Sequence, residues 1–111
     1  MTYEEVKEMV ASIAEAVGCD FSYYQFKDKP EKPFITYYYG DSDDFMADNS
    51  NYIGIRPLVI EFYSEDKDFD NENIIEEMLK SFDMPFERSE VWIDSEKMYE
   101  ISYNMEVIID G

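Results

Sequence analysis

The sequence has 111 residues, with 27 acidic and 9 basic side chains, so its formal net charge is −18 at pH 7. A chain of this length is expected to form one domain, residues 1–111, with one ordinary core. Its negative field repels phosphate backbones and anionic membrane surfaces, which argues against sequence-specific nucleic-acid binding and against membrane association.

Missing residue types narrow the chemistry further. The chain has no histidine and a single cysteine, Cys19, so an intrachain disulfide is excluded and the commonest zinc ligand and general base are absent. This cysteine usage fits a reducing, cytoplasmic setting. The N-terminal residues lack the pattern of an export signal, and no apolar run approaches the roughly 20 residues that span a bilayer.

The first predicted element is a helix that begins after Thr2 and ends at Gly18. Thr2 and Glu5 have the spacing of a capping box, and glycine is the preferred residue for a left-handed helix end. Apolar residues recur at helical spacing on one face, which predicts an amphipathic helix that covers a sheet: Val6, Met9, Val10, Ile13 and Val17.

Three β-rich segments follow this helix. Residues 21–27 and 34–39 are rich in aromatic side chains, and the prolines and charges between them predict a connection, so we expect two antiparallel strands. A third strand is expected from about 53 to 63. Its alternation places two sets of three side chains on opposite faces, Leu58, Ile60 and Phe62 against Val59, Glu61 and Tyr63.

The C-terminal part is predicted to contain a second helix and two more strands. The helix is expected over 70–82, capped by Asp68 or Asp70, with one apolar stripe formed by Ile74, Ile75, Met78, Leu79 and Phe82. Strands are expected over 86–94 and 98–109, and in the last one every odd position from 99 to 109 is apolar. The order α-β-β-β-α-β-β predicts an α+β fold, an antiparallel sheet of about five strands covered by two helices.

One long segment, 40–52, has no predicted secondary structure. Loops of this length in a small domain are often functional. One interpretation is a flap that orders against a partner subunit, and the other is a solvated loop. Its candidate partner-binding residues combine acidic side chains with aromatic or apolar ones: Asp43, Asp44, Phe45, Met46, Asp48 and Tyr52.

Residues 66–77 imitate a calcium-binding loop. Asp66, Asp68, Asp70 and Glu77 fall at the first, third, fifth and twelfth positions of the EF-hand pattern. However, Asn71 replaces the glycine that this loop requires, and the preceding segment reads as a strand. The segment is also typical of an acidic helix start, because carboxylates suit the positive end of the helix dipole. No metal and no cofactor is therefore predicted.

No set of residues in the sequence suits catalysis. Neighbouring acids such as Asp43 and Asp44, or Glu76 and Glu77, are expected by chance among 27 acidic residues, and adjacency does not place two groups across a substrate. Cys19 has no histidine to activate it, and it follows a helix C-terminus, where the dipole disfavours a thiolate. The prediction is a protein that is not an enzyme.

A small basic segment is opposite in sign to the rest of the chain. It contains Lys27, Lys29 and Lys32. A self-assembling acidic subunit would need such a segment at its joint with a neighbour, although an ordinary polar turn has the same composition.

Three stretches resemble one family of proteins: residues 1–6, the segment from Phe34 through Asp48 and Asn49 to Tyr52, and the segment from Asp94 to Gly111. They look like the small tail terminator, or tail-completion, proteins of long-tailed phages and prophages of Gram-positive bacteria. The resemblance covers nearly the whole chain. It rests on aromatic strands and acidic turns, and it carries over no catalytic residue.

The resemblance implies a structural role in the virion. Tail terminator subunits form a hexameric ring that caps the tail tube and offers a docking face to the neck, so the expected partners are further copies of the chain, the tube protein and neck or head-completion proteins. A head-completion connector is a neighbouring assignment. The charge and size also suit an acidic DNA-mimic inhibitor of a nucleic-acid-binding protein. A small acid-dependent hydrolase would need two convergent carboxylates, which the sequence does not indicate.

Overall fold

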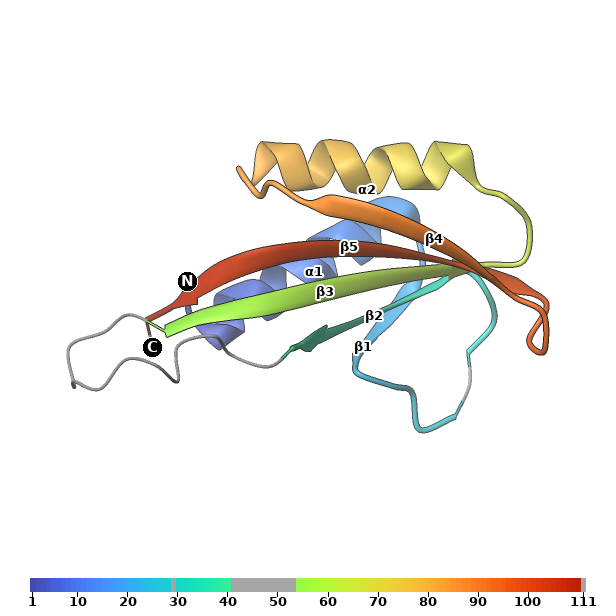
Figure 1. The fold of residues 1–111 in the computed structure, drawn as a ribbon, viewed down its shortest axis with the longest axis horizontal. Helices are drawn as coiled ribbons and strands as arrows, with labels where there is room; N and C mark the ends of the chain where they lie inside the picture. Colours follow the sequence, from blue (N-terminus) through green and yellow to red (C-terminus); the bar gives the residue numbers. More distant parts are fainter. Residues whose placement is uncertain (29, 41–53, 111) are drawn as a thin grey trace.

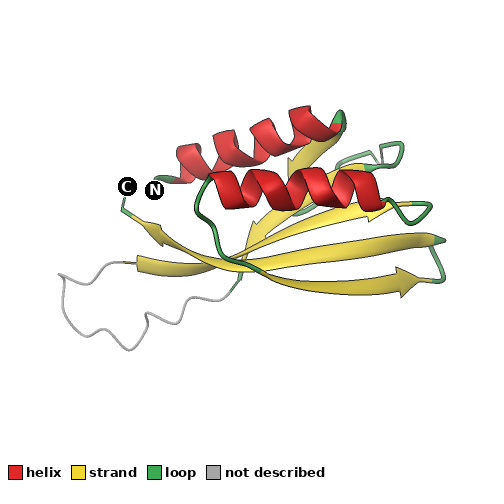
Figure 2. Ribbon diagram, turned by 90° about the horizontal axis from the view of Figure 1, so that it is seen from above, coloured by secondary structure: helices red, strands yellow, loops and turns green. Residues whose placement is uncertain are grey.

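A computed structural model of the chain describes residues 1–28, 30–40 and 54–110. The elements follow the predicted α-β-β-β-α-β-β order, and the fold class is α+β. Their bounds are α1 Tyr3–Val17, β1 Asp20–Tyr23, β2 Phe34–Tyr39, β3 Gly54–Ser64, α2 Phe69–Ser81, β4 Glu87–Ile93 and β5 Met98–Ile109. Helices α1 and α2 lie on the same face of the sheet, and within the described ranges the opposite face, called here the helix-free face, carries no helix (Figures 1 and 2).

The five strands form one mixed sheet in the order β1-β2-β3-β5-β4. The pairs β2–β3, β3–β5 and β4–β5 are antiparallel, as expected. The prediction that the first two strands are antiparallel is wrong, because β1 and β2 run parallel, with Asp20 opposite Phe34 and Tyr23 opposite Tyr37.

The connection between β1 and β2 explains this difference. The predicted strand 21–27 ends early, at Tyr23, because Tyr24 adopts a left-handed conformation (φ 65°) that turns the chain out of the sheet. Phe26 then packs edge-on against Phe34, with ring centroids 5.4 Å apart. A parallel neighbour requires the chain to return along the length of the strand, and the connection over residues 24–33 makes this return.

Helix α1 covers the sheet as its periodicity predicts. The capping box is present, since Glu5 N donates to Thr2 Oγ1 and Thr2 N donates to Glu5 Oε1. Gly18 ends the helix in the left-handed conformation, with φ 86°. The buried side chains of the helix are Val6, Met9, Val10, Ile13 and Ala14, so four of the five predicted residues are buried and Val17 is only half-buried.

The central strands β3 and β5 supply the core face of the sheet. Leu58, Ile60 and Phe62 of β3 are completely buried, as the alternation predicts. In β5 the buried odd positions are Ile101, Tyr103, Met105 and Val107. Burying each large aliphatic or aromatic side chain contributes about 1.5–3 kcal/mol to stability. The β3–β5 pair, which is aligned over eleven positions from Gly54 to Ser64, therefore organises the core.

Helix α2 covers the β5–β4 side of the sheet. Asp68 is its N-cap, because its carboxylate accepts a hydrogen bond from the backbone amide of Asn71. Ile75 and Leu79 are fully buried, whereas Phe82, which was predicted to lie in the same stripe, follows the helix and is 40 % exposed. In the part of the chain that the structure describes, neither helix has the length and hydropathy of a membrane span.

The two faces of β5 should respond differently to the same substitution. Ile101→Ala, at a fully buried position, should lower the free energy of unfolding by about 2–4 kcal/mol because it removes apolar packing and leaves a cavity. Ile108→Ala, at a position that is 51 % exposed on the same strand, should change it by about 0.5–1 kcal/mol. Urea unfolding of both variants measures the difference, and equal losses would contradict the assignment of faces.

Candidate assembly surfaces

The predicted partner-binding residues of the 40–52 segment lie outside the described residues, as does Lys29. These partner-binding residues are Asp43, Asp44, Phe45, Met46, Asp48 and Tyr52. Of the predicted basic joint, Lys27 is exposed, and Lys32 reaches across to the β4–β5 turn, where its Nζ donates to the carbonyl oxygen of Glu96 at 3.3 Å. Lys32 of this basic segment therefore makes a contact within the folded chain.

The calcium-like pattern has a structural explanation. Asp68 caps α2, and its second carboxylate oxygen accepts from the side-chain amide of Asn71 at 2.7 Å. Asp70 lies in the first turn of the helix, where the dipole favours a carboxylate. Within the described ranges, no three acidic or thiol side chains are grouped to hold a metal ion.

The described residues that were considered for catalysis, Cys19, Glu76 and Glu77, do not converge on one site. Cys19 is half-buried, and burial, together with the nearby charge of Asp20, raises the pKa of its thiol to about 11, so it stays protonated at neutral pH. Glu76 accepts a hydrogen bond from Tyr103 Oη at 3.0 Å, whereas Glu77 pairs with Lys80 in solvent. Neighbours in sequence thus have separate roles.

A buried ionic cluster joins α2 to strand β4. Glu72 is 3 % exposed, although it is a carboxylate on the core side of α2. Its two oxygens bind Lys67 and Arg88, and both cations also bind Glu90 of β4, at 2.6 and 3.0 Å. Arg88 Nε lies 3.4 Å from Glu76. A buried carboxylate is tolerated only with such partners, so two of the chain's nine cations are committed here.

The pKa shifts agree with this geometry. The hydrogen bond to Glu72 raises the pKa of Arg88 above its usual range, and bonds to Glu72 and Glu90 raise the pKa of Lys67 even though its burial acts in the opposite direction. The hydrogen bond from Lys67 lowers the pKa of Glu90. Because Glu90 has a depressed pKa in the folded state, its stabilising contribution is present above its unfolded pKa and is lost as the pH falls through the folded one.

Removing one cation from this cluster should destabilise the fold. Arg88→Ala leaves Glu72 buried with Lys67 as its one remaining cation and should lower the free energy of unfolding by about 2 kcal/mol. Lys80→Ala removes an ion pair whose two side chains are more than 60 % exposed and should cost less than about 0.5 kcal/mol. Chemical denaturation compares the two, and a loss at Arg88 no larger than at Lys80 would be the contradicting result.

The helix-free face of the sheet carries aromatic side chains at the β1–β2 side. Phe34 of β2 stacks on Tyr63 of β3, with ring centroids 4.8 Å apart and planes at 22°. Tyr24 packs against Tyr38 at 5.6 Å. Phe34 is 6 % exposed although neither α1 nor α2 covers it, because Phe26 from the connection after β1 packs against its ring.

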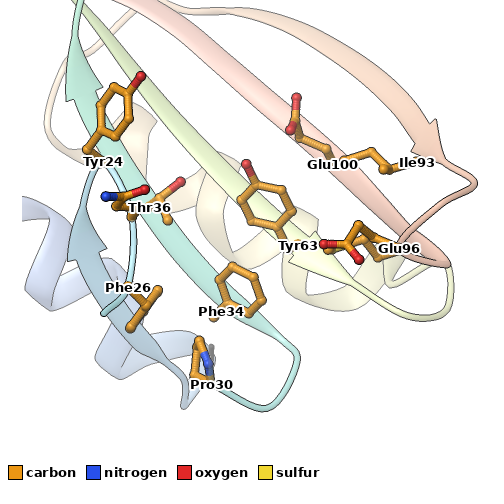
Figure 3. Close-up of a pocket in the computed structure, with 11 residues that line it drawn as sticks. Tyr24, Phe26, Pro30, Phe34, Thr36, Tyr63, Ile93, Glu96 and Glu100 are labelled. Atoms are coloured by element: carbon orange, nitrogen blue, oxygen red, sulfur yellow. The ribbon is translucent and has the colours of Figure 1, made fainter. Parts of the chain in front are cut away.

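These side chains form a shallow groove of about 420 Å³. Figure 3 shows Tyr24, Phe26 and Pro30 along one side, Phe34 and Tyr63 in the middle, and residues of β4, β5 and their turn on the other side. The complete lining is Tyr24, Gln25, Phe26, Pro30, Phe34, Thr36, Tyr63, Ile93, Glu96, Met98 and Glu100. The groove therefore combines aromatic walls with carboxylates.

A third carboxylate, Glu61, lies beside this groove on β3, next to the lining residues Thr36 and Tyr63. It accepts hydrogen bonds from Thr36 Oγ1 and Tyr63 Oη, both at 3.1 Å. Burial raises the pKa of Glu61, and the negative charge of Glu100 on the neighbouring strand raises it further, although the two hydrogen bonds act in the opposite direction. Two acids of like charge thus share one end of the helix-free face.

The shift at Glu61 predicts a pH-dependent effect on stability. Because its folded pKa lies above the unfolded value, its contribution is favourable at low pH and is lost as the pH rises through the folded pKa. Glu61→Gln should therefore raise the melting temperature at about pH 8 by about 2–4 °C and raise it less at about pH 5. Glu106→Gln, an exposed acid on the same face of β5, is the matched control. An equal gain at both pH values would contradict the shift.

The edge strand β4 is a second exposed surface. It ends the sheet, and none of its side chains is buried. Val91 is 52 % and Trp92 44 % exposed, and Trp92 packs on Tyr99 at 4.8 Å. Phe69, at the start of α2, is 71 % exposed, and its ring lies 4.9 Å from Lys67 Nζ. Exposed aromatic residues beside an open strand edge are typical of protein–protein interfaces.

Comparisons with known proteins identify the fold. No protein-family model matches the chain, and no curated protein matches it. Among solved structures, a chain of the "Virion of native gene transfer agent (GTA) particle" is similar, with a TM-score of 0.63 over 96 % of this chain and 92 % of that chain. The two sequences are 14 % identical. At this identity the likeness shows that this α+β fold also occurs in a component of that particle.

Proposed function

We propose that this protein is a structural subunit of a phage-type virion, and that it acts as a tail terminator at the head-proximal end of the tail tube. The shared fold with a component of a gene transfer agent virion carries this proposal, because the likeness extends over nearly the whole of both chains. The resemblance of residues 1–6, 34–52 and 94–111 to tail terminator proteins supports the same role.

The surfaces described above suit a subunit that assembles. Val91, Trp92 and Phe69 offer apolar area along the open edge of β4, where another protein can bury it. The chain carries a large negative charge, so two copies repel each other unless apolar burial or local cations offset the repulsion. In this proposal Lys27, Lys29 and Lys32 provide the basic side of the joint between neighbouring copies.

The proposed mechanism is steric. A closed ring on the last layer of the tube stops further addition of tube subunits, and its other face receives the neck. Segment 40–52, with Asp43, Asp44, Phe45, Met46, Asp48 and Tyr52, is the proposed contact to the tube or neck. An acidic ring also suits a channel for DNA, because carboxylates repel phosphates and do not retain them. No catalytic step and no cofactor is needed, and the protein resides in the virion after assembly in the host cytoplasm.

Native mass spectrometry tests this proposal. At moderate salt, which screens the repulsion between acidic subunits, the purified protein alone or mixed with its cognate tube protein should form a closed ring of six 13.2 kDa chains. Rings should be less abundant at low salt. Addition of the protein to polymerising tube protein should also shorten the tubes seen by electron microscopy.

Two other results would be informative. A chain that stays monomeric or dimeric with the tube protein, and leaves tube length unchanged, would contradict the tail terminator role. Tight, salt-sensitive binding of that monomer to a basic nucleic-acid-binding protein would instead favour the acidic DNA-mimic function. Trp92→Ala is a useful variant in both cases, because it removes apolar area from the β4 edge and should weaken ring formation. The substitution also removes the contact with Tyr99, so a loss of about 1 kcal/mol in stability is expected and the variant should stay folded.

A further inference from the structure

The groove on the helix-free face has an unbalanced charge. Glu100 lines it, and Glu61 lies beside it on the next strand. Thr36 and Tyr63 donate hydrogen bonds to Glu61, and Ser102 donates to Glu100 at 3.5 Å. The two carboxyl groups also contact each other, and this contact raises the pKa of Glu61 in addition to the effects of burial and of the Glu100 charge. In the described ranges of the chain, neither acid has a basic side chain within ion-pair distance. This end of the groove therefore has negative potential in a half-buried setting, where an added cation is attracted most strongly.

The aromatic side chains of the groove favour a guanidinium group over an ammonium group. Phe34 and Tyr63 stack on each other in the middle of the groove, and Tyr24, which is 63 % exposed, lies at the edge of the groove near Thr36 (Figure 3). A cation that lies over an aromatic face gains about 0.5–2 kcal/mol. A guanidinium group is flat, stacks on such rings and donates to a carboxylate through two parallel N–H groups, whereas an ammonium group is compact and strongly hydrated.

At the end of the groove formed by the β4–β5 turn, a lysine of the chain itself contacts the lining. Lys32 donates to the carbonyl oxygen of Glu96, which belongs to the turn that closes this end. A cation from another molecule would therefore lie at the Glu100 end of the groove, between the Glu100 carboxylate and the aromatic rings.

We propose that this groove binds an arginine side chain of a different protein in the assembly, with Glu100 as its carboxylate partner, Glu61 as the supporting charge and the rings of Phe34, Tyr63 and Tyr24 as its walls. The inference rests on the proposed function only for where that partner is found, namely in the tail tube or neck. The inference assigns a ligand to the groove, which has no role in the tail terminator ring proposed above.

A second copy of this chain is a poor source of the arginine. The chain has two arginines, and both are committed to internal contacts. Arg88 belongs to the buried cluster around Glu72, and Arg56 donates to Tyr3 Oη at 2.9 Å and lies over the Tyr39 ring at 5.3 Å. Another copy could offer exposed lysines such as Lys7 or Lys27, so a lysine probe distinguishes the two sources.

The experiment uses small probes on the purified full-length protein. N-acetyl-arginine methylamide is titrated at about 150 mM salt, which screens the general attraction of an acidic surface, and binding is followed by amide chemical shifts. The dissociation constant should be on the order of 1 mM, with the largest shifts at residues that line the groove. The uncharged citrulline analogue should bind at least about tenfold more weakly, and the lysine analogue about threefold more weakly.

Matched variants locate the site. Glu100→Gln should weaken arginine binding about tenfold, because it removes the paired charge but keeps the shape of the side chain. Tyr24→Ala, at an exposed wall position, should weaken it about threefold. Glu106→Gln removes one acid from the same face of β5 outside the groove and should leave binding within about twofold of the parent chain. The amide spectrum of each variant verifies that it is folded.

The outcomes separate this inference from the proposed function. Equal binding of the arginine and citrulline probes, equal effects of Glu100→Gln and Glu106→Gln, or preferred binding of the lysine probe would overturn the arginine site while leaving ring formation untouched. Arginine binding that requires Glu100, in a chain that neither forms rings nor limits tube length, would keep the site and remove the tail terminator role.

Discussion

The antiparallel pairing of β3 with β5 is the constraint on which the rest of the structure depends. Eleven aligned positions place Leu58, Ile60 and Phe62 beside Ile101, Tyr103 and Met105 on one face, and both helices must cover that face to remove it from water. The two helices cover this one face, and no helix of the described part of the chain covers the other. The helix-free face and its groove follow from this one-sided layering.

Charge allocation is the second organising feature. The sequence has three acidic residues for each basic one, so the basic side chains can pair with only a minority of the carboxylates. Some of these pairs are exposed, such as Glu77 with Lys80, and others are at positions that the fold requires. Lys67 and Arg88 neutralise Glu72, the one buried acid among the described residues, and Arg56 holds the N-terminal end of α1 through Tyr3. Glu61 and Glu100, which lie on the open face, remain without a basic partner among the described residues. A surface left in that state attracts cations from outside the molecule.

Periodicity in the sequence predicts a large part of this fold. The capping box at Thr2, the alternation in 98–109 and the cap at Asp68 depend on neighbouring residues, and all three are confirmed. The parallel β1–β2 pair was missed because the direction of a short edge strand depends on how its connection returns, which local composition does not reveal. The same connection builds the groove. Phe26 was assigned to a strand because it follows Tyr23 and Tyr24 closely, and nothing in this local sequence indicates that its ring will pack on Phe34 of another strand. The predicted site residues in 40–52 stay predictions, because they lie outside the described residues.

The chain has one tryptophan, and its position gives the β4 edge a natural optical label. Trp92 is roughly half in water, packs on Tyr99, and directs its indole Nε1 toward Asp94 at 3.3 Å. Indole emission shifts to shorter wavelength when water leaves the ring. Binding of any partner that covers this edge should therefore shift the tryptophan emission of the unmodified protein to shorter wavelength, and the shift can be followed in real time without an attached dye.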